Sequence, residues 1–341
     1  MNARWPAAST LLSKLCMEAF AAATDERLYQ ALHGRDVRSV RDLTGPELAS
    51  LITVASDIKR HPHRYDGALT GRTVAMLFEK PSLRTRVSFA VAAYQLGAQA
   101  IYLAPQEVGL ARRETVADVA RTLDQMVDAI VVRTFSHATV EQLADAASIP
   151  VINALSDFSH PCQALADYLT MHEVKGALKG LRLAFVGDGN NVANSLIFGA
   201  ALLGVRMTIA TPPGYEPRSD VLAWARHHEV EPGIACRVTS APEDAVRDAD
   251  VVYTDTWVSM GQEAEAVVRR RAFGAFQVTE RLLRCARPDA VFMHCLPAHR
   301  GEEVEAAVID SPRSIVFSQA ANRVHTEKAL LVALLGDGAT P

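Results

Sequence analysis

The chain has 341 residues, of which 49% are hydrophobic and 22% are charged. These proportions exclude a disordered or fibrous protein, and the length suggests two domains of about 100 to 200 residues each. The 35 basic and 39 acidic residues give a net charge of −4, so we expect binding of neither nucleic acid nor an anionic membrane surface. The longest apolar stretch, residues 196–205, is shorter than the roughly 18 residues that a membrane-spanning helix needs.

The cysteines and the start of the chain bear on the cellular compartment. The five cysteines are odd in number and include no CxxC pair, which disfavours a disulfide framework and a structural zinc site. The first 17 residues carry only Arg4 and Lys14 as charged side chains, too few for a secretory signal, and a weak organellar transit signal stays open. We therefore expect a cytoplasmic protein with free thiols.

Amphipathic helices alternate with short apolar strands along the chain. Thr44 and Glu47 form a capping box that predicts a first helix running to about Lys59. Strands are expected at residues 73–78, 100–103, 129–133, 151–152, 181–186, 207–210, 251–253, 290–293 and 315–317. Helices are expected at residues 85–96, 115–126, 139–147, 191–203 and 278–285, with a last helix at 326–335 that packs on either half. The alternation predicts an α/β fold with two domains, each a mainly parallel sheet covered by helices on both faces, and a domain change near residues 175–180.

Parallel sheets bind ligands outside the carboxyl ends of their strands, so the residues after each strand are examined first. The first predicted strand is followed by Ser82, Arg84, Thr85 and Arg86 at the start of a helix. A helix start offers free N–H groups and the positive end of the helix dipole, and arginine binds phosphate in a bidentate manner. This turn predicts an anion site rather than a capped, solvated helix start, although it lacks the glycines and the lysine of a P-loop.

Further hydrogen-bond donors follow the next strands. Arg133 ends the third predicted strand, and His160 and Gln163 open the helix after the fourth. Taken singly, such a histidine is more often a cap or a packing residue than a catalyst. Together the three side chains offer the donors that a polarised carbonyl or amide needs. Helical spacing turns Cys162, which lies between His160 and Gln163, toward the interior.

The second half begins with a glycine-rich turn. Gly187 and Gly189 suggest a dinucleotide site, but Val192 occupies the third glycine position of GxGxxG and the next strand lacks a ribose-binding acid, so an oxidoreductase is disfavoured. Asn191 offers a donor and an acceptor at the mouth of this turn.

An acidic loop follows the strand at residues 251–253. Its Asp255 and Ser259 suit the ammonium group of a ligand, and the neighbouring residues 269–271, all arginine, are interpreted as a solvated charge run.

Cys295 lies at the end of another predicted strand. His294, Cys295 and His299 lack a fourth zinc ligand, and the alternation of side chains along a strand points His294 and Cys295 apart, so no metal site is expected. No other residues complete a protease site around this thiol. Cys295 is therefore a candidate site thiol at the functional edge of the sheet.

Four motifs, in this order and spacing, resemble the aspartate/ornithine carbamoyltransferase family. They are SxRTR at residues 82–86, HPCQ at residues 160–163, DxxxSMG at residues 255–261 and HCLP at residues 294–297. The likeness covers about residues 34–335, and the last two motifs separate the ornithine branch of the family from the aspartate branch.

The resemblance implies an organisation and a reaction. It implies a carbamoyl-phosphate-binding domain at residues 34–165, completed by a C-terminal helix at residues 320–337, an ornithine-binding domain at residues 166–319, and an N-terminal extension of unknown role at residues 1–33. It also implies a homotrimer, or a multiple of trimers, that needs neither metal nor organic cofactor. The implied reaction transfers the carbamoyl group of carbamoyl phosphate to the δ-amine of L-ornithine, giving L-citrulline and phosphate in arginine biosynthesis or catabolism.

The same resemblance assigns site residues position by position. Carbamoyl phosphate is expected to contact ten of them: Ser82, Leu83 through its backbone, Arg84, Thr85, Arg133, His160, Gln163, Cys295, Leu296 and Arg323. Ornithine is expected to contact Asn191, Asp255, Ser259 and Met260. Arg133, His160, Asp255 and Cys295 are the residues expected to carry the catalysis.

Four positions depart from the commonest family pattern: Leu83 in place of threonine, Ala90 and Ala321 in place of glutamate, and Ala111 in place of glycine. They concern residues that support the site and contacts between subunits. Two alternatives are therefore kept: a carbamoyltransferase for another amine such as putrescine, and a catalytically silent paralogue that only binds ligands. Asp255 with Ser259 favours a substrate with an α-ammonium group, which putrescine lacks. The presence of Arg84, His160, Asp255 and Cys295 argues against a silent protein.

Overall fold

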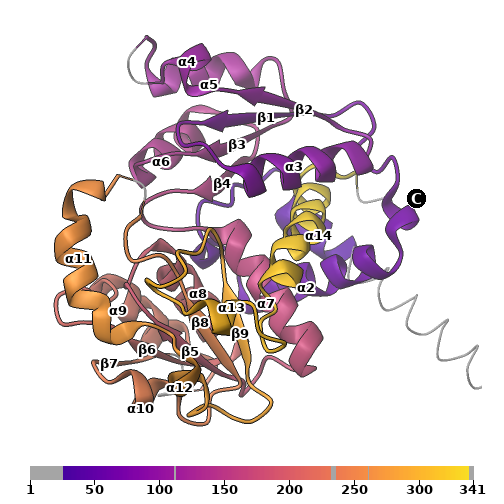
Figure 1. Cartoon of the computed structure of the whole chain (residues 1–341). Helices are drawn as coiled ribbons and strands as arrows, with labels where there is room; N and C mark the ends of the chain where they lie inside the picture. The colour runs from indigo at the N-terminus through magenta and orange to yellow at the C-terminus, as the bar shows by residue number, and fades with distance from the viewer. Residues whose placement is uncertain (1–25, 111–112, 232–235, 260, 338–341) are drawn as a thin grey trace, which may run out of the picture.

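The computed structural model describes residues 26–110, 113–231, 236–259 and 261–337 (Figure 1). Two parallel sheets form the framework, one in the upper and one in the lower part of Figure 1. The first has the order β2-β1-β3-β4 and the second the order β7-β6-β5-β8-β9. Their strands are β1 (Thr73–Phe78), β2 (Gln99–Leu103), β3 (Ala129–Arg133), β4 (Val151–Leu155), β5 (Arg182–Val186), β6 (Arg206–Ala210), β7 (Cys236–Thr239), β8 (Val251–Thr254) and β9 (Val291–His294).

Helices connect the strands and cover the sheets. The α-helices are α2 (Gly45–Arg60), α3 (Leu83–Gln95), α4 (Pro105–Val108), α5 (Val116–Asp124), α6 (His137–Ala146), α7 (Pro161–Lys175), α8 (Asn191–Leu203), α9 (Ser219–His228), α10 (Pro242–Val246), α11 (Ala266–Phe273), α12 (Glu280–Leu283), α13 (Ala306–Ile309) and α14 (Val316–Leu335). The predicted capping box is confirmed, because Thr44 and Glu47 exchange hydrogen bonds of 3.3 and 2.7 Å at the start of α2. The domain limit expected after residue 165 lies inside α7 and stays a prediction.

Both faces of each sheet are buried, which confirms the predicted fold class. In β5, Leu183 and Phe185 belong to one hydrophobic core while Ala184 and Val186 belong to another. Because successive strand residues point to opposite faces, this division shows a packed core on each side. The first sheet divides its residues between two cores in the same way.

Each sheet reverses its strand order at one point, and these points locate the ligand site. In the first sheet the chain runs from β1 to β2 on one side and then to β3 on the other. In the second sheet the reversal lies between β5 and β8. The loops that leave such a pair turn to opposite faces and open a crevice at the carboxyl ends of the strands. The four loops begin after Phe78, Arg133, Val186 and Thr254.

The last helix packs on the first half of the chain. α14 contacts α2, α3 and α7 most extensively, and Leu330, Leu331 and Leu334 on it are fully buried. In Figure 1 α14 lies between α3 and α7, far in sequence from both. This position brings residues near 323 toward the start of α3 and the start of α7.

Three sequence predictions of elements were wrong in part. Residues 315–317 were expected to form a strand, but only Ser314 bridges β9, and α14 begins at Val316. The short apolar run belongs to a helix that starts ten residues before its predicted start. The strand β7 was missed because Cys236–Thr239 is a half-exposed edge strand with a polar composition. The helix expected at residues 278–285 is the single turn α12.

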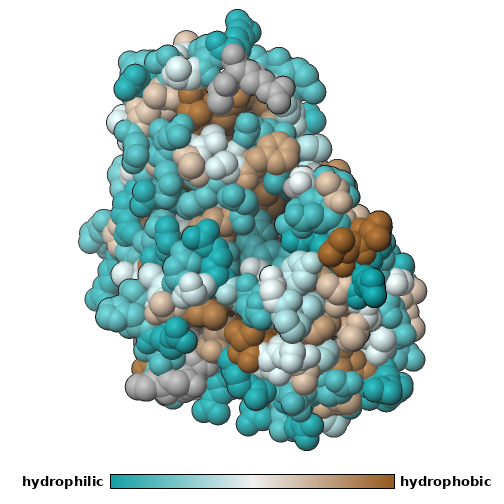
Figure 2. Space-filling view, turned by 90° about the vertical axis from the view of Figure 1, so that its left-hand side faces the viewer, coloured by the Kyte–Doolittle hydropathy of each residue, from teal (hydrophilic) through white to brown (hydrophobic). Residues whose placement is uncertain are grey.

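On the side of the molecule seen in Figure 2 the surface is mainly hydrophilic, and apolar residues appear in small separate patches. Within the part of the chain that the structure describes, no helix is both long enough and apolar enough to cross a bilayer.

Candidate active site

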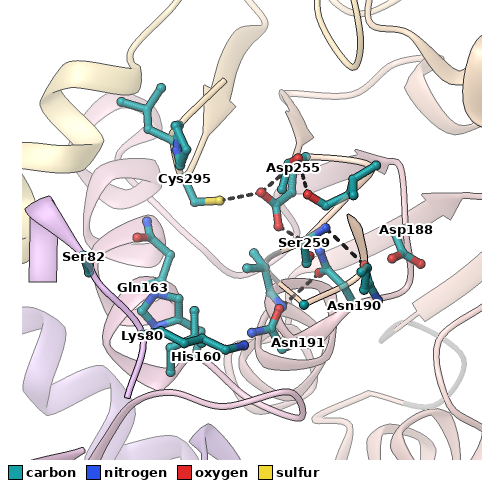
Figure 3. A pocket seen from close by; sticks show the side chains of 18 of the residues that line it. Lys80, Ser82, His160, Gln163, Asp188, Asn190, Asn191, Asp255, Ser259 and Cys295 are labelled. Carbon is teal, nitrogen blue, oxygen red and sulfur yellow. Dashed lines mark hydrogen bonds between the residues drawn. The ribbon is translucent and has the colours of Figure 1, made fainter. Parts of the chain in front are cut away.

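A cavity of about 990 Å³ lies where the carboxyl ends of the two sheets meet. Loops and helix starts from both halves line it, and Figure 3 shows side chains from several of these elements pointing into it. Of the predicted site residues, the cavity is lined by Ser82, Leu83, Arg84, Thr85, Arg133, His160, Gln163, Asn191, Asp255, Ser259, Cys295, Leu296 and Arg323. The remaining one, Met260, lies outside the described residues, as does Ala111.

The start of α3 forms one wall. Ser82 is the N-cap, and its Oγ accepts a hydrogen bond of 3.2 Å from the backbone N–H of Thr85. The first turn contains no acidic residue, so the positive end of the helix dipole is not neutralised there. The side chain of Leu83 is 75% exposed to solvent, and it has neither a hydrogen-bond donor nor a charge with which to bind an anion. Its backbone N–H is one of the free donors of the helix start.

Three arginines, Arg84, Arg133 and Arg323, surround the space beside this helix start. Burial and, after it, the like charges of Arg323 and Arg84 lower the pKa of Arg133 to about 10. Arg323 is 1% exposed and is bound to Glu327 at 2.7 Å. The buried Nε of Arg133 has no hydrogen-bond partner within the part of the chain that the structure describes. Repulsion among like charges and an unpaired donor both indicate a site built for an anion.

His160 is a neutral donor or acceptor in this site. Burial lowers its pKa well below the ordinary value, and Arg323, Arg133 and Arg84 lower it further. Among the described residues, the buried Nδ1 of His160 has no hydrogen-bond partner. A neutral imidazole beside three guanidinium groups can polarise a ligand without adding charge.

Asp255 forms the opposite wall, at the end of β8. The thiol of Cys295 donates to its Oδ1 at 2.9 Å, the backbone N–H of Thr256 donates to the same oxygen, and Asn190 donates to its Oδ2 at 2.8 Å. Burial and Asp255 together raise the pKa of Cys295 well above the ordinary value of a thiol. Cys295 therefore keeps its proton; Figure 3 shows its contact with Asp255.

Asn191 and Ser259 complete this wall. Asn191 is the first residue of α8, and its side chain donates to the carbonyl of Ser156 at 2.6 Å, which ties the second sheet to the loop after β4. The backbone N–H of Ser259 donates to Gln262 at 3.1 Å, and Ser259 lines the cavity.

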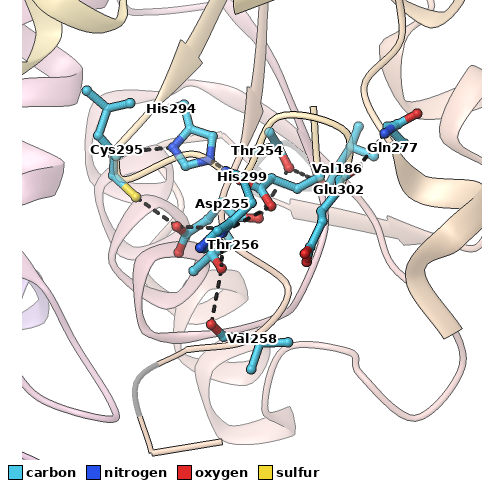
Figure 4. Close-up of polar contacts among 12 residues, drawn as sticks. Val186, Thr254, Asp255, Thr256, Val258, Gln277, His294, Cys295, His299 and Glu302 are labelled. Carbon is cyan, nitrogen blue, oxygen red and sulfur yellow. Dashed lines mark hydrogen bonds and ion pairs between the residues drawn. The ribbon is translucent and has the colours of Figure 1, made fainter. Parts of the chain in front are cut away.

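The structure changes the expectation for His294. His294, Cys295 and Asp255 offer potential ligand atoms within 4.8 Å of one another, so His294 and Cys295 do not point apart. The strand ends at His294, and the alternation rule does not extend to Cys295. Figure 4 shows that both ring nitrogens of His294 are used: Nδ1 accepts from the N–H of Leu296 at 2.8 Å, and Nε2 contacts Glu303 at 3.2 Å. His294 thus supports the loop that carries Cys295.

For two arginines the structure contradicts the interpretation made from the sequence. Arg269 is only 7% exposed and bridges the buried Asp188 at 2.7 Å and the carbonyl of Trp257, so it is not a solvated charge. Arg86 does not line the cavity: its guanidinium group lies over the ring of Tyr102 at 3.9 Å. Of the two arginines in SxRTR, Arg84 alone faces the ligand space.

Sequence reasoning gave no site role to Lys80, whose side chain lines the cavity. It is 7% exposed, its Nζ lies 4.3 Å from the centre of the Phe135 ring, and burial and Arg133 lower its pKa. Its position one residue before the turn at Pro81 was the signal for a site role.

The fold and the cavity together define a class of protein: an α/β enzyme with two parallel sheets, an anion site on one and a carboxylate–thiol pair on the other, facing one cavity. Family models for the two domains of one enzyme family match nearly the whole chain. The model "Aspartate/ornithine carbamoyltransferase, carbamoyl-P binding domain" matches residues 35–173, and "Aspartate/ornithine carbamoyltransferase, Asp/Orn binding domain" matches residues 179–334. The chain belongs to the aspartate/ornithine carbamoyltransferase family.

Individual relatives agree with this membership. An anabolic ornithine carbamoyltransferase of Pyrococcus furiosus is 52% identical over 311 residues, which is 90% of this chain and 98% of the relative. The ornithine carbamoyltransferase of Bacillus subtilis is 48% identical over 308 residues, 90% of this chain and 96% of the relative. A solved structure of ornithine carbamoyltransferase from Pyrococcus furiosus superposes with a TM-score of 0.86 at 51% identity, covering 89% of this chain and 98% of that chain.

Proposed function

We propose that the protein transfers the carbamoyl group of carbamoyl phosphate to the δ-amine of L-ornithine, releasing L-citrulline and phosphate. The observation that carries this proposal is the cavity, in which Arg84, Arg133 and Arg323 face the Asp255–Cys295 pair. The arginine wall suits the anionic phosphate of an acyl phosphate, and the Asp255 wall suits the α-ammonium group of an amino acid. The relative from Pyrococcus furiosus is named an anabolic enzyme, which supports the direction toward citrulline.

The arginine wall binds carbamoyl phosphate. The phosphate lies at the start of α3, where Ser82, the backbone of Leu83, Arg84 and Thr85 provide donors and positive charge. The carbamoyl group extends toward Arg133, His160 and Gln163, with Arg323 between the two ends of the substrate. This orientation places the side chains of Arg133 and His160 near the carbonyl oxygen.

The opposite wall binds ornithine. Asp255, Asn191 and Ser259 hold the α-amino and α-carboxylate groups, together with Met260 of the same motif. Cys295 and the backbone of Leu296 lie at the junction between the substrates and orient the δ-amine. Cys295 is a proton-bearing hydrogen-bond donor, so it serves neither as a covalent nucleophile nor as a thiolate base.

The reaction follows from this placement. The lone pair of the uncharged δ-nitrogen forms a bond to the carbonyl carbon, and negative charge develops on the carbonyl oxygen. Arg133, His160 and Thr85 stabilise that oxygen, because donors fixed in advance interact with the transition state more strongly than with the substrate. The bond between the carbon and the phosphate oxygen then breaks, the phosphate leaves on the arginine wall, and the nitrogen loses one proton, which the departing phosphate takes up. Holding both substrates at attack distance supplies much of the rate acceleration.

We also propose assembly into trimers and a cytoplasmic location. Leu83, Val87 and Tyr94 lie four and seven residues apart on one stripe of α3 and are 75%, 50% and 82% exposed. An exposed apolar stripe of this kind is typical of a surface between subunits. The four described cysteines are free thiols, which fits a reducing compartment. Light scattering of the purified protein measures the number of subunits.

Substrate identity is tested with an amine panel. The purified chain is incubated with carbamoyl phosphate and, separately, with ornithine, putrescine, N-acetylornithine and aspartate, and the carbamoylated products are identified by mass spectrometry. Citrulline is expected to form fastest at matched concentrations. Faster reaction of another amine contradicts the ornithine assignment, and the absence of any carbamoylated product together with retained ligand binding indicates a silent paralogue.

A further inference from the structure

The side-chain amide of Gln163 lies between two groups with opposite hydrogen-bonding capacity. Its Nε2 donates to Oδ1 of Asp167 at 2.8 Å, and its Oε1 accepts from Arg323 at 2.9 Å. A carboxylate oxygen accepts and a guanidinium group only donates, so reversing the amide would replace both bonds with repulsive contacts. Asp167 and Arg323 therefore determine which way the amide of Gln163 faces.

Asp167 is itself held from several sides. It is fully buried on α7, one turn after Gln163, and it accepts hydrogen bonds from Gln319 at 2.7 Å and from the hydroxyl of Tyr253 at 3.1 Å. These two donors come from α14 and β8, so the carboxyl group cannot turn away from Gln163 without losing both. Burial raises the pKa of Asp167 to about 7. When it is protonated on the oxygen facing Tyr253, the oxygen facing Gln163 still accepts.

After these bonds are formed, the amide of Gln163 can still form hydrogen bonds with a ligand. A primary amide has two N–H donors and two lone pairs, and Asp167 and Arg323 use one of each. Gln163 lines the cavity, whereas Asp167 does not, so the remaining donor and lone pair serve the ligand. A carbamoyl group carries the matching acceptor and N–H donor. An acetyl group has a methyl in place of the NH₂ and leaves the lone pair of Gln163 without a partner, which costs affinity.

We propose that Asp167 is a positioning residue that makes the site selective for carbamoyl phosphate over acetyl phosphate, by fixing the donor and acceptor sides of the Gln163 amide. The inference rests on the proposed function and extends it to a residue that does not touch the substrate. It gives a role to a buried carboxyl group whose contacts span both halves of the chain.

Three variants of the full chain separate positioning from structural support. Asp167→Val removes the acceptor with a side chain of similar size, so that no space for water opens. Asp167→Asn keeps an acceptor oxygen for Gln163. Tyr253→Phe is the matched control, because it removes a different hydrogen bond of Asp167 and leaves the contact with Gln163 intact. Should Asp167→Val fail to fold, Asp167→Ser replaces it, because the shorter hydroxyl does not reach Gln163.

The readouts are kcat/KM for carbamoyl phosphate in citrulline formation and the inhibition constants of acetyl phosphate and inorganic phosphate. Asp167→Val is expected to lower kcat/KM for carbamoyl phosphate roughly tenfold while both inhibition constants change less than about twofold. Asp167→Asn and Tyr253→Phe are expected to keep the selectivity within about threefold of the wild type.

Two results would overturn the inference. Equal losses for all three phosphate compounds in Asp167→Val indicate a purely structural role, and unchanged selectivity shows that Asp167 does not orient Gln163. The proposed function fails in a different way, because a wild-type chain that forms no citrulline contradicts it before any variant is compared.

Discussion

The two walls of the cavity hold their polar groups in different ways. On the wall of the first sheet, Arg133 and His160 each keep a buried nitrogen that has no partner among the described residues, and burial together with neighbouring positive charges lowers the pKa of both. On the wall of the second sheet, both oxygens of Asp255 already accept hydrogen bonds. The first wall is therefore incomplete until an anion arrives, whereas a ligand on the second wall must share or replace existing bonds. Charge should dominate binding on the first wall and geometry on the second.

The largest effect that tests this comparison is expected for Arg84→Ala. Removing a charged contact to the phosphate from a buried site should lower kcat/KM by a factor on the order of 10² to 10⁴. Arg86→Ala is the matched control, because Arg86 lies over Tyr102 outside the cavity and its loss should change kcat/KM less than about threefold. Steady-state kinetics with varied carbamoyl phosphate measures both variants, and equal losses would contradict the placement of the anion at Arg84.

A smaller loss is expected on the second wall for Cys295→Ala. The variant removes one hydrogen bond to Asp255 and the contact that orients the amine, so kcat/KM for ornithine should fall roughly tenfold to a hundredfold. Cys295→Ser, which retains a donor, should recover part of the loss. Intact-mass measurement during turnover checks the chemistry, since a covalent adduct on Cys295 in the wild type would refute direct attack by the amine.

Arg269→Met should affect stability more than rate. Breaking the bridge to Asp188 leaves a buried carboxylate without its partner, which should lower the free energy of unfolding by about 3 kcal/mol. Arg271→Met is the control, since Arg271 is exposed and should change stability by less than about 0.5 kcal/mol. Chemical denaturation compares the two, and similar losses would restore the interpretation of residues 269–271 as a solvated run.

The smallest effect is expected for Cys162→Ala. Its thiol is fully buried, points at the carbonyl of Asn153 at 3.6 Å, and has a pKa raised to about 12 by burial. The variant should lose about 1 kcal/mol of stability and keep kcat/KM within about twofold. Thermal unfolding and kinetics measure the two quantities, and a large loss of activity at unchanged stability would place Cys162 in the site.

Much of the fold and the cavity follows from local patterns. Apolar runs bounded by turns marked most strands, and the residues after those strands line the cavity because parallel strands end on one edge. The search for apolar runs failed at two places. The run at residues 315–317 belongs to the long helix that begins at Val316, and the half-exposed strand at Cys236–Thr239 has no apolar run.

The remaining site features depend on contacts between distant residues. Arg269 and Asp188 are 81 positions apart, and the sequence around either residue does not indicate that they form an ion pair. The contact of Asp167 with Gln319 joins residues 152 positions apart. Arg86 is different, because residues two apart on a helix face opposite sides, so its spacing from Arg84 already indicated that the two could not share a ligand.

The position of α14 in the sequence determines when the active site can form during synthesis of the chain. This helix follows α3 and α7 in the sequence and leaves the ribosome after them, yet it fills the space between the two and carries Arg323 into the cavity. Until it emerges, a nascent chain holds an anion site with one arginine missing and an apolar groove open to solvent. Chains released before residue 323 are therefore both inactive and exposed to proteolysis and aggregation, so that catalysis begins only after α14 has been synthesised and has packed.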